Sequence, residues 1–429
     1  MPATGFIDAV GFNPTAGGTG SFVVSAALTG YQTPAAGGAV NGAVYAYRAQ
    51  SLDLTQWEIG FGTYASGTTT LARTTITANS AGTTAAINFS TAPNVYCTAL
   101  SADLINLAST GSGYVNKFRN AGMDIWQRGT SISAASGGGT YTADGWMVTP
   151  SGAAVTVTQA AGRLLGTNSL KVTGAASVTD VLVYQRIESL VAAPLASQSV
   201  TVQAQIYNNT GASITPTLTV THPSAIDNWS SAQTTDLNAA SLQPCPNGAW
   251  TRVAYTFSAA AASGYGLQVL LDFGNNLSSG GKSVQVTELD IRVTPFAPVG
   301  LNAAPPPPEL RAVGTEMTFC QRYFQKSYGQ GVPPGSNVGG GGGAILMVGP
   351  ASGYWGTFVR YPVVMRASIQ PVTYDNAGAS GKVSYLVSAW TNGGTPTISA
   401  WSDSGFAFYY GPQSGMTNLS MDYAVSAEL

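Results

Sequence analysis

Short apolar stretches alternate with turn-rich polar stretches along almost the whole chain. Trp57, Ile59 and Phe61 occupy alternate positions, which is typical of a strand with one buried face. Similar apolar runs separated by glycine-rich turns recur at residues 42–47, 71–78, 86–89 and 95–100. Turn signals at intervals of about 8–12 residues predict a sandwich or barrel. We assign residues 1–108 to this N-terminal β domain.

A glycine- and serine-bearing joint at residues 109–113 precedes a second β-rich segment, residues 114–298. Eight strands over roughly 180 residues match a jelly-roll-sized sandwich. The predicted strands are residues 155–159, 169–173, 181–187, 199–207, 215–221, 250–257, 266–273 and 284–293.

Four consecutive prolines, Pro305–Pro308, predict a polyproline II spacer, so we read residues 299–309 as a Pro-rich linker. The next segment predicts one short helix. Its apolar positions are spaced 3, 4, 3 and 4 residues apart, which resembles a coiled-coil seam. These positions are Leu310, Val313, Met317, Cys320 and Phe324. Two interpretations stay open: the helix packs on its own domain, or it forms a parallel bundle with copies of the chain.

Further alternating runs at residues 383–387, 397–401, 406–410 and 421–425 make residues 310–429 a helix followed by a C-terminal β domain. The prediction is therefore an all-β chain, with several β-sandwich or jelly-roll domains in series and one short helix before the last of them. Residues 339–343 are five glycines without a following Lys-Ser/Thr, so they predict a turn rather than a phosphate-binding loop.

The composition of the chain excludes several classes of function. Charged residues are 8% of the chain, against about 25% in an average soluble domain. The net charge is −2 and no basic cluster exists, which argues against nucleic-acid binding. The longest strongly apolar run, residues 344–348, is far shorter than the ~18 residues of a membrane span. The first residues lack the pattern of a secretion signal, so we expect synthesis in a cytoplasm and no membrane insertion.

Cysteine and histidine are too scarce for most catalytic sites. Cys97, Cys245 and Cys320 are far apart in sequence and are expected to be free thiols. The chain has one histidine, His222, without a nucleophile motif nearby, which argues against Ser-His or Cys-His chemistry. We expect no cofactor.

Several motifs resemble those of tail-fibre and receptor-binding proteins of tailed bacteriophages and prophages. They are residues 118–131 (ending in Trp-Gln-Arg-Gly-Thr-Ser), 141–146 (Tyr-Thr-Ala-Asp-Gly-Trp), 320–328 (Cys-Gln-Arg-Tyr-Phe-Gln-Lys-Ser-Tyr), 361–367 and 427–429 (Ala-Glu-Leu). Residues 57–64, 71–75 and 87–90 are similar to a module at the head of many such proteins. The chain departs from the family at Ala121, which separates a usual Asn-Gly pair, and at Gly145, where the family has arginine.

The resemblance implies a virion structural protein, commonly trimeric, with a middle sandwich like a carbohydrate-binding module. Its partners would be copies of itself, other virion proteins and a host surface polysaccharide. We therefore expect a phage fibre that attaches to the particle by its N-terminal domain and recognises a glycan through its C-terminal domain. A head fibre, collar or capsid decoration protein is the alternative, and a glycan depolymerase is a weaker one.

Sugar binding needs exposed aromatic rings beside amides or hydroxyls. In the middle domain we expect such a contact in the polar stretch 223–243, at Trp229, Asn228 and Asp227 together with the nearby His222. Trp250 is expected to be a core residue, and Trp126 and Trp146 are expected to be core or interface residues. In the last domain the candidates are Tyr354, Trp355, Trp390, Trp401, Tyr409 and Tyr410.

Glycan hydrolysis would need two carboxylates about 5–10 Å apart. Glu288 and Asp290 lie two positions apart on one predicted strand and should share a face. The alternatives are a solvated strand face, or a structural cation held together with Asp124. Since only 19 acidic residues are present, we expect a protein that is not an enzyme.

Overall fold

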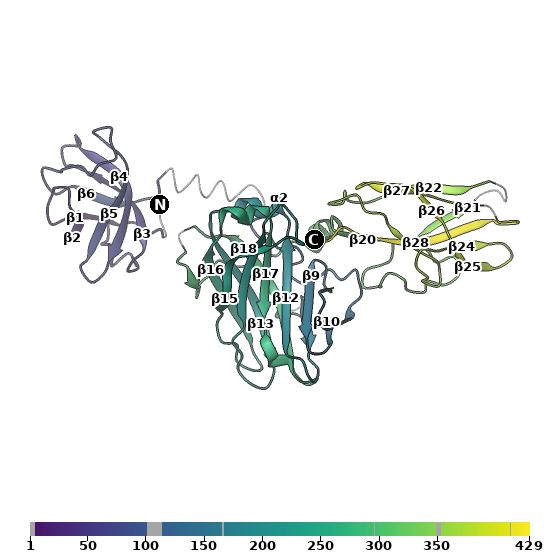
Figure 1. The fold of residues 1–429 in the computed structure, drawn as a ribbon. Helices are drawn as coiled ribbons and strands as arrows, with labels where there is room; N and C mark the ends of the chain where they lie inside the picture. Colours follow the sequence, from purple (N-terminus) through teal and green to yellow (C-terminus); the bar gives the residue numbers. More distant parts are fainter. Residues whose placement is uncertain (1–4, 101–113, 165–166, 296, 349–352, 412) are drawn as a thin grey trace. The chain divides into compact units, whose positions relative to one another are not determined.

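The computed structural model describes residues 5–100, 114–164, 167–295, 297–348, 353–411 and 413–429 (Figure 1). Its regular structure is almost entirely β, which confirms the predicted fold class. The chain divides into two compact units, residues 1–115 with 294–298, and residues 116–293 with 299–429. The middle sandwich and the C-terminal β domain thus belong to one unit. The predicted joint at 109–113 lies outside the described residues.

The first unit contains a closed barrel with the strand order β1-β2-β5-β4-β3-β6. Residues 86–89 form no strand, and Phe89 makes only an isolated bridge to Gly18. Two short strands near the start of the chain, β1 and β2, were not predicted. The strands are β1 (Gly11–Pro14), β2 (Phe22–Ala27), β3 (Val44–Gln50), β4 (Trp57–Ala65), β5 (Thr70–Asn79) and β6 (Asn94–Cys97).

A buried ion pair lies inside this barrel. Glu58 and Arg73 are almost fully buried, and Arg73 Nε donates to Glu58 Oε1 over 2.7 Å. The Tyr47 hydroxyl donates to the same carboxylate over 2.7 Å, and the Arg73 guanidinium lies 4.9 Å from the ring centroid of Phe22. Burial, and then the neighbouring Glu58 carboxylate, raise the pKa of the Tyr47 hydroxyl. Each charged group therefore has a partner, as burial requires.

The middle sandwich consists of two antiparallel sheets. One has seven strands in the order β19-β16-β13-β18-β11-β10-β7, and the other has six in the order β15-β14-β17-β12-β9-β8. The first comprises β7 (Ser131–Ala134), β10 (Val155–Ala161), β11 (Asn168–Thr173), β13 (Ser199–Asn209), β16 (Trp250–Ser258), β18 (Ser283–Val293) and β19 (Gly300–Leu301). The second comprises β8 (Thr140–Tyr141), β9 (Trp146–Ser151), β12 (Asp180–Ile187), β14 (Thr217–Pro223), β15 (Gln233–Ser241) and β17 (Leu267–Asp272).

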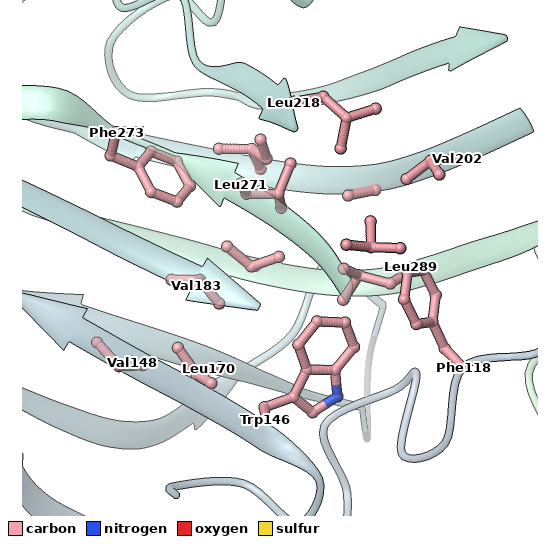
Figure 2. Packing of buried hydrophobic residues seen from close by; sticks show 14 of the residues in the cluster. Phe118, Trp146, Val148, Leu170, Val183, Val202, Leu218, Leu271, Phe273 and Leu289 are labelled. Carbon is pink, nitrogen blue, oxygen red and sulfur yellow. The ribbon is translucent and has the colours of Figure 1, made fainter. Parts of the chain in front are cut away.

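All eight strands predicted for this segment are present, with ends shifted by a few residues. Their alternate apolar side chains meet between the two sheets, where Val202 and Leu289 of one sheet lie near Val183 and Leu271 of the other (Figure 2). Trp146 fills the same core. Short helical turns connect the sheets: α2 (Ser189–Ala192), η1 (Ala193–Leu195), η2 (Ala261–Tyr265) and η3 (Gly274–Leu277).

The proline run is not a free spacer, contrary to the prediction for residues 299–309. Side chains of the seven-stranded sheet hold its carbonyl groups: Gln203 Nε2 donates to Pro306 O over 2.8 Å, and Arg292 Nη2 donates to Pro307 O over 3.0 Å. Arg252 Nη2 also donates to Pro306 O, over 2.5 Å. Because proline carbonyls have no partner within polyproline II, they are available to these donors. The segment is a strap across the sheet.

The predicted helical seam is wrong at both ends. The helix α3 covers Val313–Gln321, so Leu310 precedes it and Phe324 begins the strand β20 (Phe324–Lys326). Cys320 and Phe324 are buried within the chain, whereas Val313 is 55% exposed. The apolar positions do not line one exposed face, and this favours the interpretation that the helix packs on its own domain. Met317 is half-buried.

The C-terminal domain contains two further sheets. The long strand β28 pairs with β20, β21, β23 and β24, and β24 pairs with β25. The second sheet has the order β22-β27-β26. The strands are β20 (Phe324–Lys326), β21 (Ile345–Val348), β22 (Trp355–Arg360), β23 (Val372–Tyr374), β24 (Val383–Leu386), β25 (Trp390–Gly394), β26 (Thr397–Trp401), β27 (Gly405–Tyr410) and β28 (Asn418–Ser426).

Candidate functional site

A row of side chains crosses the outer face of the seven-stranded sheet. Tyr207 of β13 pairs directly with Trp250 of β16 on one side and with Gln285 of β18 on the other. Gln285 pairs with Lys171 of β11, which in turn pairs with Thr158 of β10. Directly paired residues project from the same face of a sheet, so these five side chains form one line.

This line faces away from the hydrophobic core. The neighbours of the row along the strands, Ile206, Val284 and Val172, are fully buried between the sheets. The five row residues are all half-buried. The rings of Tyr207 and Trp250 lie 5.4 Å apart between centroids, tilted by 53°. Trp250 is thus a surface side chain, and its prediction as a core residue is wrong.

The strap covers the adjoining part of the same face. Arg252 and Gln203, which hold the strap, belong to the same two strands as Trp250 and Tyr207. Desolvation lowers the pKa of Arg252, although the nearby Asp290 and Glu288 carboxylates oppose the change. The strap does not cover Trp250, Tyr207 and Gln285. These residues therefore supply the aromatic rings and the amide group of the uncovered surface.

The two carboxylates predicted to form a catalytic pair or a cation site are held by arginines. Arg163 binds Glu288 in a bidentate manner, with Nε to Oε1 at 3.0 Å and Nη2 to Oε2 at 2.9 Å. Arg292 Nε donates to Asp290 Oδ1 over 2.7 Å. Glu288 lies in a β-bulge with φ 50°. A β-bulge changes the direction of a side chain. The two-residue alternation that predicted a shared face for Glu288 and Asp290 therefore does not apply here.

The predicted cation near these residues is not supported either. Asp124 Oδ1 accepts a hydrogen bond from Asn168 Nδ2 over 2.8 Å. Within the described ranges, no group of three or more His, Cys, Asp or Glu side chains could hold a metal ion. Arginines neutralise Glu288 and Asp290 in place of a cation.

The cluster predicted around Trp229 is engaged in internal contacts. Asp227 accepts hydrogen bonds from Ser189 N over 2.7 Å and from Ser189 Oγ over 2.9 Å. His222 is 5% exposed, and its Nδ1 lies 2.7 Å from Oδ1 of Asp236. Trp229 is half-buried, with the Arg186 guanidinium 5.1 Å from its ring centroid.

Asn228 is the most open member of this cluster, and its Oδ1 accepts from Ser230 Oγ over 2.7 Å. The stretch predicted as one long loop contains the edge strand β15, so the loop is only residues 224–232. The polar side chains predicted to meet a ligand here serve mainly to fix that short loop.

The aromatic candidates of the C-terminal domain separate into buried and exposed groups. Trp355 and Tyr410 are buried in the domain core, at 4% and 8% exposure, so their rings are not open to a ligand. Trp390 is half-buried beneath the glycine loop, since a Cβ at Gly340 would lie 2.7 Å from its Cδ1. The exposed rings are Trp401 (45%), Tyr354 (75%) and Tyr409 (39%).

The family-like motifs meet at the contact between the sandwich and the C-terminal domain. Glu428 accepts hydrogen bonds from Arg119 over 2.7 Å and from Arg128 over 3.2 Å. The two guanidinium carbons each lie 3.8 Å from a ring centroid, Arg119 over Tyr323 and Arg128 over Phe324. These motifs therefore build a buried joint.

The other motif residues are also buried. Trp126 and Trp146 are 1% exposed and each donates its indole N–H to a backbone carbonyl, at Met123 and Asn120 respectively. Of the two predicted alternatives, core or interface, both residues are in the core. Gly145, where the similar fibre motifs have arginine, has φ 80°, and a Cβ at this position would lie only 2.4 Å from Nε of Arg119. Glycine therefore leaves room for the Arg119 side chain.

The three cysteines are free thiols, as predicted. Burial raises the pKa of Cys97 to about 12 and that of Cys245 to about 11, and the pKa of Cys320 is also raised by burial. A thiol needs a lowered pKa to act as a nucleophile near neutral pH, so none of them is suited to that role. In the described part of the chain, no helix has the length and apolarity needed to cross a bilayer.

No protein-family model matches this chain, and no curated protein sequence matches it. Similar solved structures include the N-terminal CBM22-1-CBM22-2 tandem domain of Paenibacillus barcinonensis Xyn10C, which is 15% identical with a TM-score of 0.26 and covers 71% of this chain and 91% of that chain. Another is the CBM22-1-GH10 part of Clostridium thermocellum endo-1,4-beta-D-xylanase 10B, complexed with xylohexaose (14% identity, TM-score 0.26, 36% of this chain and 27% of that chain).

A third similar structure is the enzymatically active domain of bacteriophage CBA120 tailspike protein 4, at 10% identity and a TM-score of 0.26, covering 42% of this chain and 22% of that chain. The chain thus spans about a quarter of the length of the xylanase and tailspike chains that it matches. Carbohydrate-binding modules and a tailspike domain are among the structures to which this chain is similar.

Sequence reasoning missed Tyr207, Gln285 and Lys171 as surface partners of Trp250. Each was correctly placed on or at the end of a strand, but their alignment depends on which strands are neighbours. The order β16-β13-β18-β11 joins strands that are far apart in sequence. The available signal was an aromatic or polar residue at an outward position of each strand.

Proposed function

We propose that this protein is a bacteriophage virion fibre, a tail fibre or receptor-binding protein, which binds a host cell-surface glycan without cleaving it. It assembles as a homotrimer into the virion in the bacterial cytoplasm, and its N-terminal barrel attaches it to other virion proteins. The motif resemblance at residues 118–131, 320–328 and 427–429 supports the virion assignment.

The observation that carries glycan binding is the row on the seven-stranded sheet. The rings of Trp250 and Tyr207 offer apolar surfaces to the C–H faces of sugar rings, while Gln285 and Lys171 offer hydrogen bonds to hydroxyl groups. Neighbouring strands lie about 4.8 Å apart, so the five-strand row is roughly 19 Å long. This length suits a short segment of a polysaccharide.

The ion pairs of the carboxylates near this row support binding without cleavage. A retaining or inverting glycosidase uses one carboxyl group as an acid and another as a nucleophile or base. Glu288 and Asp290 each form an ion pair with an arginine. Each carboxylate is thus occupied by an arginine side chain, which supports a binding role rather than cleavage.

Binding of the full-length protein to purified host envelope polysaccharide tests the proposal. We expect Tyr207→Ala and Trp250→Ala each to weaken binding about tenfold, because stacking on an aromatic ring contributes on the order of 1–2 kcal/mol. Tyr265→Ala is the matched control, since Tyr265 is 42% exposed and lies outside the row. Equal binding by all three variants would contradict the site, and shortened polysaccharide chains would contradict the non-catalytic assignment.

Two further measurements test the fibre assignment. The mass in solution should equal three chains, and a stable monomer at micromolar concentration would refute the trimer. Gold-labelled antibody should place the protein on the phage tail in electron micrographs. Labelling of the capsid shell would instead favour the head-fibre, collar or decoration alternative.

A further inference from the structure

The small sheet of the C-terminal domain has one buried and one open face. Phe406, Phe408 and Tyr410 of β27 lie in the domain core. Between them, Ala407 and Tyr409 project to the opposite side, where they pair with Phe358 and Gly356 of β22. Phe358 is 46% exposed and Tyr409 is 39% exposed, so two aromatic rings stand on the outer face of this sheet.

A third ring joins them from the residue before β22. Tyr354 is 75% exposed, and its ring meets that of Tyr409 edge to face, with centroids 5.5 Å apart and an interplanar angle of 89°. Edge-to-face packing is a favourable geometry for aromatic pairs. The pair is therefore ordered relative to the sheet although Tyr354 is mostly exposed.

Glycines on the two strands allow the rings to lie against the backbone. A Cβ on Gly405 would be 2.7 Å from Cε1 and Cζ of Phe358, so the Phe358 ring occupies the space over this glycine. A Cβ on Gly356 would be 3.0 Å from Cβ of Tyr409. Larger residues at these positions would displace the rings, so the glycines allow the rings to lie close to the strands.

This face carries one positive charge. Arg360 is the only charged residue of β22, β26 and β27, and it is exposed. Its guanidinium carbon lies 5.8 Å from the Phe358 ring centroid. Within the part of the chain that the structure describes, no carboxylate forms a salt bridge with it. A guanidinium in this state is suited to a carboxylate supplied by a ligand.

The size of the face fits a sugar better than a second copy of the chain. An aromatic side chain has about 150–250 Å² of surface, so Tyr354, Phe358 and Tyr409 expose roughly 300 Å² at their observed fractions. A stable protein interface needs about 800 Å² per partner. Three rings beside one cation can instead stack against two or three sugar units and pair with one acidic group.

We propose that Tyr354, Phe358, Tyr409 and Arg360 form a second glycan-binding site, selective for a polysaccharide that contains a carboxylate-bearing sugar. This inference rests on the proposed function in that both assign glycan binding, but it concerns a different surface and a different sugar chemistry. Two sites on one chain would strengthen attachment to a polymer, because the second binding event becomes intramolecular.

The test uses the full-length protein on an array of acidic polysaccharides containing glucuronate, galacturonate or sialate, with neutral glucans, mannans and galactans beside them. We expect the unsubstituted protein to bind at least one acidic polysaccharide. The double substitution Tyr354→Ser/Tyr409→Thr should weaken that binding at least tenfold. Arg360→Gln should weaken it about fivefold and leave binding to the same polymer after carboxyl reduction unchanged.

Matched controls separate this inference from the proposed function. Tyr265→Ser should bind as the unsubstituted protein does, and thermal melting should confirm that every variant is folded. If only Tyr207→Ala and Trp250→Ala reduce binding, the proposed function stands and this site is refuted. If only the Tyr354/Tyr409 and Arg360 variants reduce it, this site stands and the sandwich row is refuted.

Two other outcomes would also overturn the inference. Retention of neutral polysaccharides alone would refute the preference for an acidic sugar. A lower assembly mass of the Tyr354/Tyr409 variant in sedimentation would show that the face is a contact between copies of the chain.

Discussion

Arg119 and Glu428 form a buried ion pair, with Nη2 of the arginine 2.7 Å from Oε2 of the glutamate across 309 positions of sequence. Their side chains are 8% and 5% exposed. The same carboxylate accepts from Arg128, which also lies 3.8 Å from Asp144, so one glutamate of the C-terminal domain contacts two arginines of the sandwich. This arrangement explains why short motifs far apart in the sequence act together.

Removal of this carboxylate should destabilise the second unit strongly. We expect Glu428→Gln to lower its free energy of unfolding by about 3 kcal/mol, because the buried Arg119 guanidinium would lose its counter-charge. Urea denaturation followed by tryptophan fluorescence measures the change. The control is Asp403→Asn, at an exposed carboxylate. Equal unfolding midpoints for the two variants would contradict the importance of the joint.

Acidification from pH 7 to about 5 should stabilise the sandwich locally at Asp180. Burial, followed by the hydrogen bond and charge of Asp272, raises the pKa of Asp180 to about 6. A raised carboxyl pKa means that the folded state binds the proton more tightly than the unfolded state. The protein therefore loses stability as the pH rises from about 4 to about 6 through this group.

The variant Asp180→Asn should remove that part of the pH dependence. Calorimetric melting temperatures at pH 4, 5, 6 and 7 test this expectation, with Asp403→Asn as the control. If Asp180→Asn has the same pH profile as the unsubstituted protein, Asp180 does not titrate in this range.

The glycine loop should tolerate no side chain where it covers Trp390. A methyl group at Gly340 would lie 2.7 Å from Cδ1 of the indole, so Gly340→Ala should cost about 1–3 kcal/mol of stability and shift the tryptophan emission. Gly281→Ala is the control, because nothing lies within 4 Å of its Cβ position. That change should stay within about 0.5 kcal/mol. Comparable effects of the two substitutions would argue against the close contact.

Loss of one of the side chains that hold the strap should loosen the proline run on the sheet. Arg252 donates to Pro306 O and to Oε1 of Gln203, so Arg252→Met removes both contacts. Hydrogen exchange at the amides of residues 302–304 and 309 should become faster, and protease cleavage near residue 303 should increase. Lys171→Met, on the same sheet without a contact to the strap, is the control. Unchanged exchange in the Arg252 variant would show that other contacts suffice.

Local patterns predicted the regular elements well where apolar alternation was strong. All eight strands predicted in the sandwich were found, whereas the edge strand β15 was missed because its sequence, Gln-Thr-Thr-Asp-Leu-Asn-Ala-Ala-Ser, is mostly polar and exposed. An edge strand buries little, so its composition resembles that of a loop. The prediction of the helical seam was wrong although its local apolar pattern was strong. Phe324 fits a heptad in sequence, but pairing with β28 places it in a strand.

Candidate site residues were harder to predict because exposure depends on neighbours from distant parts of the chain. Trp355 and Trp401 are both strand residues near loops, yet one is 4% and the other 45% exposed. Trp250 was expected in the core, but its outward position beside Tyr207 is set by the pairing of β16 with β13. Glu288 and Asp290 were identified as a pair, and only the structure revealed their separate arginines.

The sequence by itself determined the all-β class, most of the strands and the scarcity of charge, because these follow from composition and from the two-residue period of a strand. The tertiary structure decided which aromatic rings are open, how the prolines are held and where the motifs meet. Strand order and side-chain packing join residues hundreds of positions apart, and no local pattern contains that information. The 8% of charged residues illustrates both parts. The sequence shows how few charged residues there are. The structure shows that many of them form buried ion pairs, such as Arg73 with Glu58 and Arg119 with Glu428.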